Sequence, residues 1–446
     1  SGIKTGGGVE TDKLPSGVRD RAMKAIDSCG GRVTIGDVAS KAGLKLNEAE
    51  KALQAIAADT GGFLEVSDEG DVLYAFSRDY RSKLAGKSFK MKLEPLLEKS
   101  KAAAEYLIRV SFGTTLIVSI VLVYTTIIAL LTSRSDEDNR GRRGRSYNSG
   151  FNMFFRPSDL FWYWDPYYYR RRQPSSDNMN FVESVFSFVF GDGDPNQGIE
   201  EDRWKLIGEY ISSNGGVVAA EELAPYLDVS LSEETDDESY ILPVLLRFDG
   251  HPEVDDEGNI LYYFPSLQRS ALSERSRRKE YVGKRWTDWV GGVNNFFKEK
   301  TWQFSKTANT ERAMVVGLGV VNLLGVIILN SMLKEVAVTP GGFISFVSQI
   351  FPLLQIYAAS FFAIPIFRWF FLVKTNTEIE KRNRAREKRA LALERPELSL
   401  RRKLLSARDM AQRTIISQDR IIYSTQQDVS DQDIEARDWD QRFREL

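Results

Sequence analysis

A twelve-residue phrase that occurs twice constrains the architecture of this chain more than any other feature. Residues 65–76 read EVSDEGDVLYAF and residues 253–264 read EVDDEGNILYYF, with eight identical positions. Upstream, Gly30-Gly31 matches Gly215-Gly216, and the intervening region is three residues longer in the second copy. Because a sequence repeat reflects a repeated structural unit, we predict two copies of one small domain, over residues 11–85 and 198–270.

Both copies show the same order of secondary-structure signals. A first helix is expected over about 16–28 and 200–213, and it ends at the Gly-Gly pair, a common stop signal. A short strand and a short helix follow, and then a third helix over about 47–59, with Asn47 as its N-cap, or about 237–248. Each copy closes with a hairpin around an Asp-Glu-Gly turn. This order is typical of a winged-helix domain, so we expect a mainly α protein with small β wings.

Charge argues against DNA binding by these two domains. Residues 11–85 contain 11 basic and 12 acidic side chains, whereas residues 198–270 contain 4 basic and 17 acidic, a net charge of −13. Cationic contacts to phosphate supply most non-specific affinity for nucleic acid, and the second copy lacks them. We therefore predict protein-docking modules. The candidate docking residues are acidic side chains of the third helix and of the turns: Glu48, Glu50, Asp68, Glu69, Asp256 and Glu257.

Three apolar runs predict transmembrane helices, over residues 107–133, 313–333 and 341–373. The first contains 23 consecutive uncharged residues, from 110 to 132, long enough to cross a bilayer. The second and third are expected to form a helical hairpin. Arg368 lies near the end of the third run, where its side chain can reach the lipid headgroups.

Two other segments are expected at the membrane surface. Residues 281–300 predict an amphipathic interfacial helix, with Phe297 among the apolar residues of its membrane face. The linker over residues 134–196 joins an Arg-Gly stretch, a dense aromatic stretch and a short apolar helix over 180–190. Interleaved aromatics and arginines occur at membrane interfaces and also in single-stranded RNA sites, and we favour the membrane here. The interface residues are expected to be Trp162, Trp164, Phe186, Phe190, Trp286, Trp289, Phe296, Arg368 and Trp369.

Charge leaves the membrane topology partly open. Residues 374–413 of the charged helical tail, which spans 374–446, hold 13 basic and 6 acidic side chains, so the tail and the second copy are expected on the same side. Basic residues flank the first apolar run at both ends. If that run crosses fully, the first copy lies opposite the second. A common side would need a re-entrant first run or a second crossing within residues 151–190. The tail itself could pack on its own protein or on a partner.

The chain lacks the residues of common catalytic and metal sites. It has one cysteine, Cys29, and one histidine, His251, too few for a zinc or iron–sulfur ligand set. Phosphate-binding loops and metalloprotease or serine-hydrolase motifs are also missing from the sequence. We therefore expect a non-catalytic membrane scaffold or accessory subunit without a cofactor, in contact with lipids and other subunits of a large membrane complex. The alternative is a membrane tether for nucleic acid, acting through the linker and the tail.

The repeated phrases and the stretch NFVESVFSFVFGDGDPN over residues 180–196 resemble a plant plastid integral membrane protein family with cyanobacterial relatives. The resemblance covers most of the chain. It implies a multi-pass protein of the chloroplast envelope or thylakoid, and a cleaved transit peptide, which a start at Ser1 also suggests. Members are often labelled as iron–sulfur cluster biosynthesis proteins, but a single cysteine cannot hold a cluster, so the residues do not support that label.

Overall fold

The computed structural model describes residues 9–137, 180–229, 238–271, 296–335, 342–412 and 414–426. The protein is mainly helical, with small sheets and three helices that are long and apolar enough to cross a membrane. It divides into two compact units. The first, which we call the body, comprises residues 1–96, 196–300 and 378–446, and the second, the span unit, comprises residues 97–195 and 301–377.

The N-terminal segment of the body alternates helices with short strands. A 3-10 turn, η1 (Glu10–Lys13), precedes α1 (Ser16–Ser28), β1 (Arg32–Thr34), α2 (Ile35–Ala42), α3 (Leu46–Thr60), β2 (Phe63–Ser67), β3 (Val72–Ala75) and α4 (Tyr80–Lys87). The helix expected over about 16–28 is present as α1. Asn47 lies inside α3 rather than at its N-cap. The Glu48 carboxylate accepts a hydrogen bond from the backbone N–H of Lys45 (3.2 Å), which makes Lys45 the N-cap, two residues earlier.

The central segment, residues 196–271, has a similar order of elements. It contains α8 (Ile199–Ser213), β4 (Val217–Val218), α9 (Ala220–Leu223), the 3-10 turns η4 (Ala224–Tyr226) and η5 (Ser239–Ile241), α10 (Leu242–Phe248), β5 (His251–Val254), β6 (Ile260–Tyr263), α11 (Pro265–Gln268) and β7 (Arg269–Ser270). The helix expected over about 237–248 is shorter than predicted. Its first described turn is the 3-10 turn η5, and Pro243 follows at the start of α10.

The sheets of the two segments have matching registers. In each, the hairpin strands pair antiparallel, and the second hairpin strand also pairs with the short strand that follows the Gly-Gly turn. Leu64 lies opposite Tyr74, and Pro252 lies opposite Tyr262. In both segments the second glycine of the Gly-Gly pair has a positive φ and its carbonyl accepts a 2.8 Å hydrogen bond from the phenylalanine that ends the hairpin.

Helix starts in the two segments also use the same device. Thr34 caps α2: its hydroxyl accepts from the Asp37 N–H, and the Asp37 carboxylate accepts from the Thr34 N–H, both at 3.0 Å. In the central segment the Glu222 carboxylate accepts from the Ala219 N–H at 2.8 Å, so the acidic half of the cap is retained. An acidic residue three positions into the helix therefore sets both starts.

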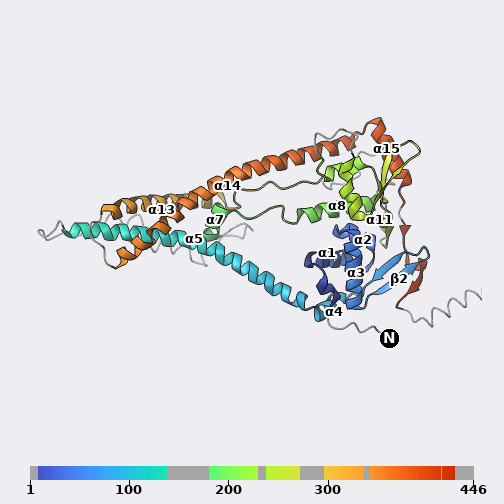
Figure 1. The fold of residues 1–446 in the computed structure, drawn as a ribbon, viewed down its shortest axis with the longest axis horizontal. Coiled ribbons are helices and arrows are strands. Elements are labelled where there is room, and N and C mark those ends of the chain that lie inside the picture. The colour runs from blue at the N-terminus through green and yellow to red at the C-terminus, as the bar shows by residue number, and fades with distance from the viewer. Residues whose placement is uncertain are drawn as a thin grey trace, which may run out of the picture. The chain divides into compact units, whose positions relative to one another are not determined.

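The two segments share one hydrophobic core. Helices α2 and α8 pack directly against each other (Figure 1), and buried residues of both segments form a single cluster that includes Ile26, Leu53, Ile207 and Phe248. Glycine permits this close approach, because a Cβ on Gly208 of α8 would lie 2.7 Å from the Cα of Ser40 in α2. A Cβ on Gly36 of α2 would likewise lie 1.9 Å from the backbone oxygen of Ser266 in α11. Burial of this joint apolar surface is the main stabilising contribution to the seam.

Polar contacts extend the seam between the segments. The buried Asp37 carboxylate accepts hydrogen bonds from the Ser270 hydroxyl (2.6 Å) and the Ala271 N–H (2.9 Å). The Thr34 hydroxyl donates to the Arg269 carbonyl at 3.0 Å. The cap of α2 is therefore completed by the end of the central segment, which makes the two segments parts of one folded body.

The tail is part of the body. The last part of α14 (Phe343–Glu394) leads into α15 (Leu398–Met410), where Leu404 and Ala407 pack on Val217 and Leu261 of the central sheet. The short strand β8 (Thr414–Ile415) pairs in parallel with β7. After the 3-10 turn η7 (Gln418–Arg420), strand β9 (Ile421–Ser424) joins the edge of β2, giving a four-stranded sheet of order β1-β3-β2-β9.

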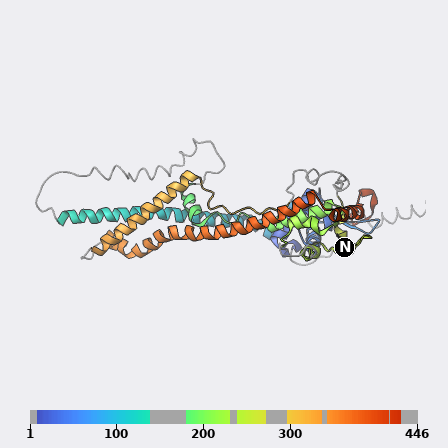
Figure 2. The same cartoon turned by 90° about the horizontal axis from the view of Figure 1, so that it is seen from above.

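The span unit contains the apolar helices. These are α5 (Phe89–Glu137), α7 (Phe181–Phe190), α13 (Asn309–Glu335) and α14. Figure 2 shows the apolar stretches of α5 (teal), α13 and α14 (orange) alongside one another, and they share a core that includes Val123, Leu329 and Leu354. The Ser119 hydroxyl donates to the Asn322 side chain (2.8 Å) between α5 and α13.

Part of the predicted surface helix over 281–300 differs from expectation. Residues 296–300 are not helical, and Phe297, which was placed on the membrane face, is buried in the body core. Residues 272–295 lie outside the described residues, as do 138–179 of the linker. The predictions for Trp162, Trp164, Trp286 and Trp289 therefore fall outside the described part of the chain.

Candidate functional site

The two Asp-Glu-Gly turns, predicted as docking tips, differ in their surroundings. At the first, Arg420 of the tail binds both acidic side chains, with Nε 3.1 Å from Asp68 Oδ1 and Nη2 2.5 Å from Glu69 Oε1. At the second, Asp256 and Glu257 are exposed, and in the described part of the chain no ion pair reaches either side chain. The acidic side chains of the first tip are thus paired with the protein's own tail while about half exposed, and those of the second tip have no such pairing among the described residues.

Neighbouring Asp255 shapes the second turn. Its carboxylate accepts hydrogen bonds from the backbone N–H groups of Glu257 (3.0 Å) and Asn259 (2.7 Å). A hydrogen bond with Ser406, followed by those from Asn259, lowers the pKa of Asp255 to about 2. Asp255 therefore stays ionised at physiological pH and holds the open tip in a defined conformation.

The two docking candidates on α3 have different environments. Glu48 is half-buried and caps α3 through the Lys45 N–H. Glu50 is exposed and accepts a 3.1 Å hydrogen bond from Gln54 one turn later. Glu48 is therefore committed to the helix start, and Glu50 is the member of this pair that solvent or a partner can reach.

The basic tail binds the acidic central segment. Arg386 of α14 has 1% of its side chain exposed, and its guanidinium binds Asp228 and lies 2.8 Å from Glu299 Oε1. It also stacks on the Phe297 ring, 4.9 Å from the centroid, while Arg203 of α8 lies 4.5 Å from the same centroid. Phe297 is therefore held between two arginines, and we call this set of five residues the arginine clasp.

Arg382 reinforces the arginine clasp. It forms a two-pronged contact with Glu299, with Nε at 2.9 Å and Nη2 at 2.6 Å. Burial alone would raise the pKa of Glu299, but the hydrogen bonds from Arg382 and Arg386 lower it below its ordinary value. Glu299 is thus an ionised, largely buried anchor for α14.

A second set of charges fixes α15. Lys403 is almost fully buried, and its Nζ donates to Glu221 Oε1 (3.0 Å) and Glu238 Oε1 (2.5 Å). The Tyr262 hydroxyl donates to the other oxygen of Glu238 at 2.6 Å. Together with the clasp, these contacts show that basic side chains of the tail are matched to acidic side chains of the central segment. The sequence signal that could have revealed this pairing is the opposite net charge of the central segment and the tail.

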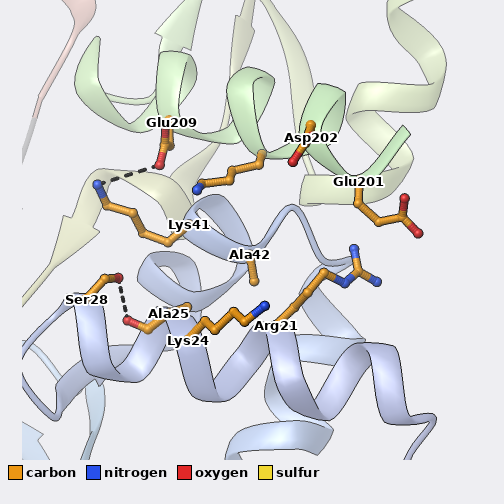
Figure 3. A pocket seen from close by; sticks show the side chains of 10 residues that line it. Arg21, Lys24, Ala25, Ser28, Lys41, Ala42, Glu201, Asp202 and Glu209 are labelled. Atoms are coloured by element: carbon orange, nitrogen blue, oxygen red, sulfur yellow. Dashed lines mark hydrogen bonds and ion pairs between the residues drawn. The ribbon is translucent and has the colours of Figure 1, made fainter. Parts of the chain in front are cut away.

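A cavity of about 350 Å³ opens between α1, α2 and α8 in the body. Its lining carries both signs of charge. Lys41 lies 3.8 Å from Glu209 across the seam, and the Arg21 side chain of α1 points toward Glu201 of α8 (Figure 3). The mixed lining leaves no strong field for a charged ligand. Its single hydroxyl, on Ser28, donates to the Ala25 carbonyl at 2.8 Å. Among the described residues, no group of three or more His, Cys, Asp or Glu side chains is placed to hold a metal ion.

In the span unit, Arg368 binds the end of α7. Its Nη2 donates to the carbonyls of Phe188 (3.0 Å) and Phe304 (2.5 Å), and its guanidinium lies 4.4 Å from the Phe304 ring centroid. A cation at a helix C-terminus satisfies carbonyls that lack intrahelical partners. Arg368 was expected to reach lipid headgroups, and these protein partners were missed because the sequence does not show that α7 ends beside it.

The other described interface candidates lie near α7 or on α14. Phe186 packs under the Arg109 guanidinium, 5.5 Å from the ring centroid, and Phe190 packs edge-on against Phe112 at 4.8 Å between ring centroids. Trp369 is exposed on α14. Phe296 is half-buried.

Comparison with known proteins identifies the family of the chain. No protein-family model and no solved structure matches it. The chain is 67% identical over 449 residues to "Uncharacterized protein At5g03900, chloroplastic" of Arabidopsis thaliana, an alignment that covers 100% of this chain and 86% of the relative. That name carries neither a membrane nor an iron–sulfur description. Identity at this level over the whole chain shows common descent, and the protein belongs to the plant chloroplast family that includes this Arabidopsis protein.

Proposed function

We propose that the protein is a non-catalytic scaffold or accessory subunit of a chloroplast membrane complex, anchored by several membrane crossings. The observation that carries this proposal is the composition of the body. Three separate stretches of chain build it, and the two connections between them contain the three apolar helices. Anchoring and the folding of the soluble part are therefore coupled, as suits a protein that holds a complex at a membrane.

This composition bears on the topology that the sequence left open. The N-terminal and central segments share one core, so both lie on the same side of any membrane. An even number of crossings must separate them. If α5 crosses, a second crossing must precede the central segment, whereas α13 and α14 can leave and return as a pair. We therefore propose that the body lies on one side and that Glu335, at the end of α13, lies on the other.

The two body segments are best interpreted as winged-helix domains adapted to bind protein. Their helix order, matched hairpin registers and common turn geometry support this fold. The DNA-binding version needs a cationic surface. Here the acidic central segment instead binds the basic tail of its own chain, and Asp256 and Glu257 supply an open acidic tip for a partner.

The structure does not favour a nucleic-acid tether. Arg382, Arg386 and Lys403 of the basic tail are engaged by Glu and Asp of the body. Arg386 and Lys403 are almost fully buried, so they are not available for phosphate without opening the body. The iron–sulfur label of the resembling family receives no support from Cys29, which is buried in the body core.

The proposal is tested by purifying the tagged full-length chain from plastid membranes in mild detergent. We expect a stable complex with other membrane subunits, weakened by Asp256→Lys/Glu257→Lys. A matched control, Asp20→Lys/Glu380→Lys, makes the same change in net charge at two half-exposed acids elsewhere and should leave the complex intact. A chain that is recovered alone from fresh membranes, in several mild detergents, would contradict the scaffold role.

A further inference from the structure

The tail strand β9 covers a sheet edge that is well suited to bind another chain. The Thr425 N–H donates to the Leu64 carbonyl (3.0 Å), and the Leu64 N–H donates to the Thr425 hydroxyl (2.9 Å). The Asp68 N–H donates to the Arg420 carbonyl at 2.9 Å. Strand addition of this kind is a common mode of peptide recognition, and here the peptide belongs to the same chain.

The attachment of β9 is weak. Ile422 is 70% exposed and Tyr423 is 42% exposed, so the strand buries little apolar surface. The ion pairs of Arg420 with Asp68 and Glu69 are partly exposed, and pairs of this kind contribute about 0–1 kcal/mol each. Backbone hydrogen bonds add about 1 kcal/mol each. Such a strand can be exchanged without unfolding the domain beneath it.

The matching edge in the central segment is built differently. Strand β5 pairs only with β6 among the described strands, and it carries Pro252 at the register position of Leu64. Proline lacks the N–H that an added strand would need, and it is a common means of blocking strand addition at an edge. The edge of β5 is therefore protected by its sequence, whereas the edge of β2 keeps a functional donor at Leu64 and is covered by a removable strand.

We propose that the β2 edge and the Asp68–Glu69 tip form a docking site for an extended segment of a partner protein, and that β9 occupies this site until the partner arrives. The partner segment would run antiparallel to β2. It would carry a cation immediately before the strand, as Arg420 precedes Ile421, to meet the acidic tip. This inference rests on the scaffold role and specifies the chemistry of one partner.

The test uses the full-length chain in detergent and a fluorescent peptide copying residues 417–426, SQDRIIYSTQ. In Arg420→Glu, repulsion from Asp68 and Glu69 should release β9, and we expect this variant to bind the peptide at least about tenfold more tightly than the wild type. Adding Leu64→Pro should abolish the gain. Because Pro252 occupies the same register in the sister hairpin, the fold should accept the change, which far-ultraviolet circular dichroism would verify.

Two controls make the result specific. Asp256→Lys/Glu257→Lys in the Arg420→Glu background should leave peptide affinity unchanged, whereas Asp68→Lys/Glu69→Lys should reduce it. A peptide with Thr425→Pro lacks the donor to Leu64 and should bind poorly, and this change cannot affect folding of the protein. Equal peptide affinity in the wild type and Arg420→Glu, or binding that is insensitive to Leu64→Pro and to the proline peptide, would overturn the proposal.

Three further outcomes separate this inference from the scaffold role. Self-association of the wild-type chain that the peptide reverses would assign the edge to a second copy and overturn the partner assignment. Failure of peptide binding while the membrane complex survives purification would reject the docking site alone. Recovery of a solitary chain that still binds the peptide would reject the scaffold role.

Discussion

Replacement of Arg386 by methionine should loosen α14 from the body by about 3 kcal/mol. Arg386 has 1% and Glu299 has 11% of its side chain exposed, and breaking a buried ion pair costs about 3–5 kcal/mol. Loss of the stacking on Phe297 adds about 1 kcal/mol. Two features reduce the total, because Arg382 still pairs with Glu299 and Asp228 is half-exposed to water.

The assay is amide hydrogen exchange of the full-length chain in detergent, followed on peptides from residues 382–394. A loss of about 3 kcal/mol corresponds to roughly hundredfold faster exchange, since 1.4 kcal/mol is a factor of about ten. The control is Arg384→Met, whose side chain is 75% exposed and pairs with Glu380 at 3.4 Å one turn away. Arg384→Met should accelerate amide exchange of residues 382–394 only about twofold. Equal exchange in Arg386→Met and Arg384→Met would refute the assignment of the arginine clasp as the anchor of α14.

Three other perturbations give distinct results. Because the pKa of Glu299 is lowered in the body, the stabilisation that its ionised carboxylate gives is fully present above the ordinary pKa of 4.5 and is lost as pH falls through the lower pKa of the folded state. Amide hydrogen exchange of α14 should therefore accelerate on acidification. The acceleration should be smaller in Glu299→Gln. Gly36→Val should weaken the packing of the two body segments by about 1–3 kcal/mol, which limited proteolysis between the segments would detect. Gly17→Ala has open space around the added Cβ and should leave proteolysis unchanged. Arg368→Met should speed exchange of the last turn of α7 about tenfold, because up to about 2 kcal/mol of helix-terminal stabilisation is removed, and Arg368→Lys should restore part of it.

The sequence predicted the parts of the body that depend on local signals. The Gly-Gly turns, the Asp-Glu-Gly hairpins and the apolar helices lie where residue pattern and turn chemistry place them. The start of α3 was misplaced by the Asn47 assignment because Glu48 caps the helix from inside, a competition that residue type alone does not resolve.

Long-range pairings were the part that the sequence did not show. The joint core depends on close glycine contacts of α2, with Gly208 of α8 at Ser40 and with Gly36 at Ser266 of α11, which no periodicity marks. Phe297 was assigned to a membrane face because large apolar residues beside lysines fit an interface equally well. Its burial became evident only with the arginines that sandwich it. The acidic and basic regions were recognised separately, and their mutual pairing requires the folded chain.

Among the candidate docking residues, some environments could be predicted from the sequence and others required the folded chain. Exposure of Asp256, Glu257 and Glu50 follows from their positions in a turn or on a polar helix face. The role of Glu48 as a cap depends on where the backbone of α3 begins. The pairing of Asp68 and Glu69 with Arg420 depends on the backbone path of a tail more than 350 residues away in sequence.

The most direct test of the central claim is the sidedness of single cysteines in sealed plastid membrane vesicles. In a Cys29→Ala background, cysteines would be placed at Asp68, at Asp256 and at Glu335 at the end of α13, and labelled with a membrane-impermeant maleimide. We predict that the cysteines at positions 68 and 256 react from the same side and that the cysteine at 335 reacts only after the vesicles are opened, or the reverse pattern in inverted vesicles. Labelling of positions 68 and 256 from opposite sides would contradict a single body anchored at one face of the membrane.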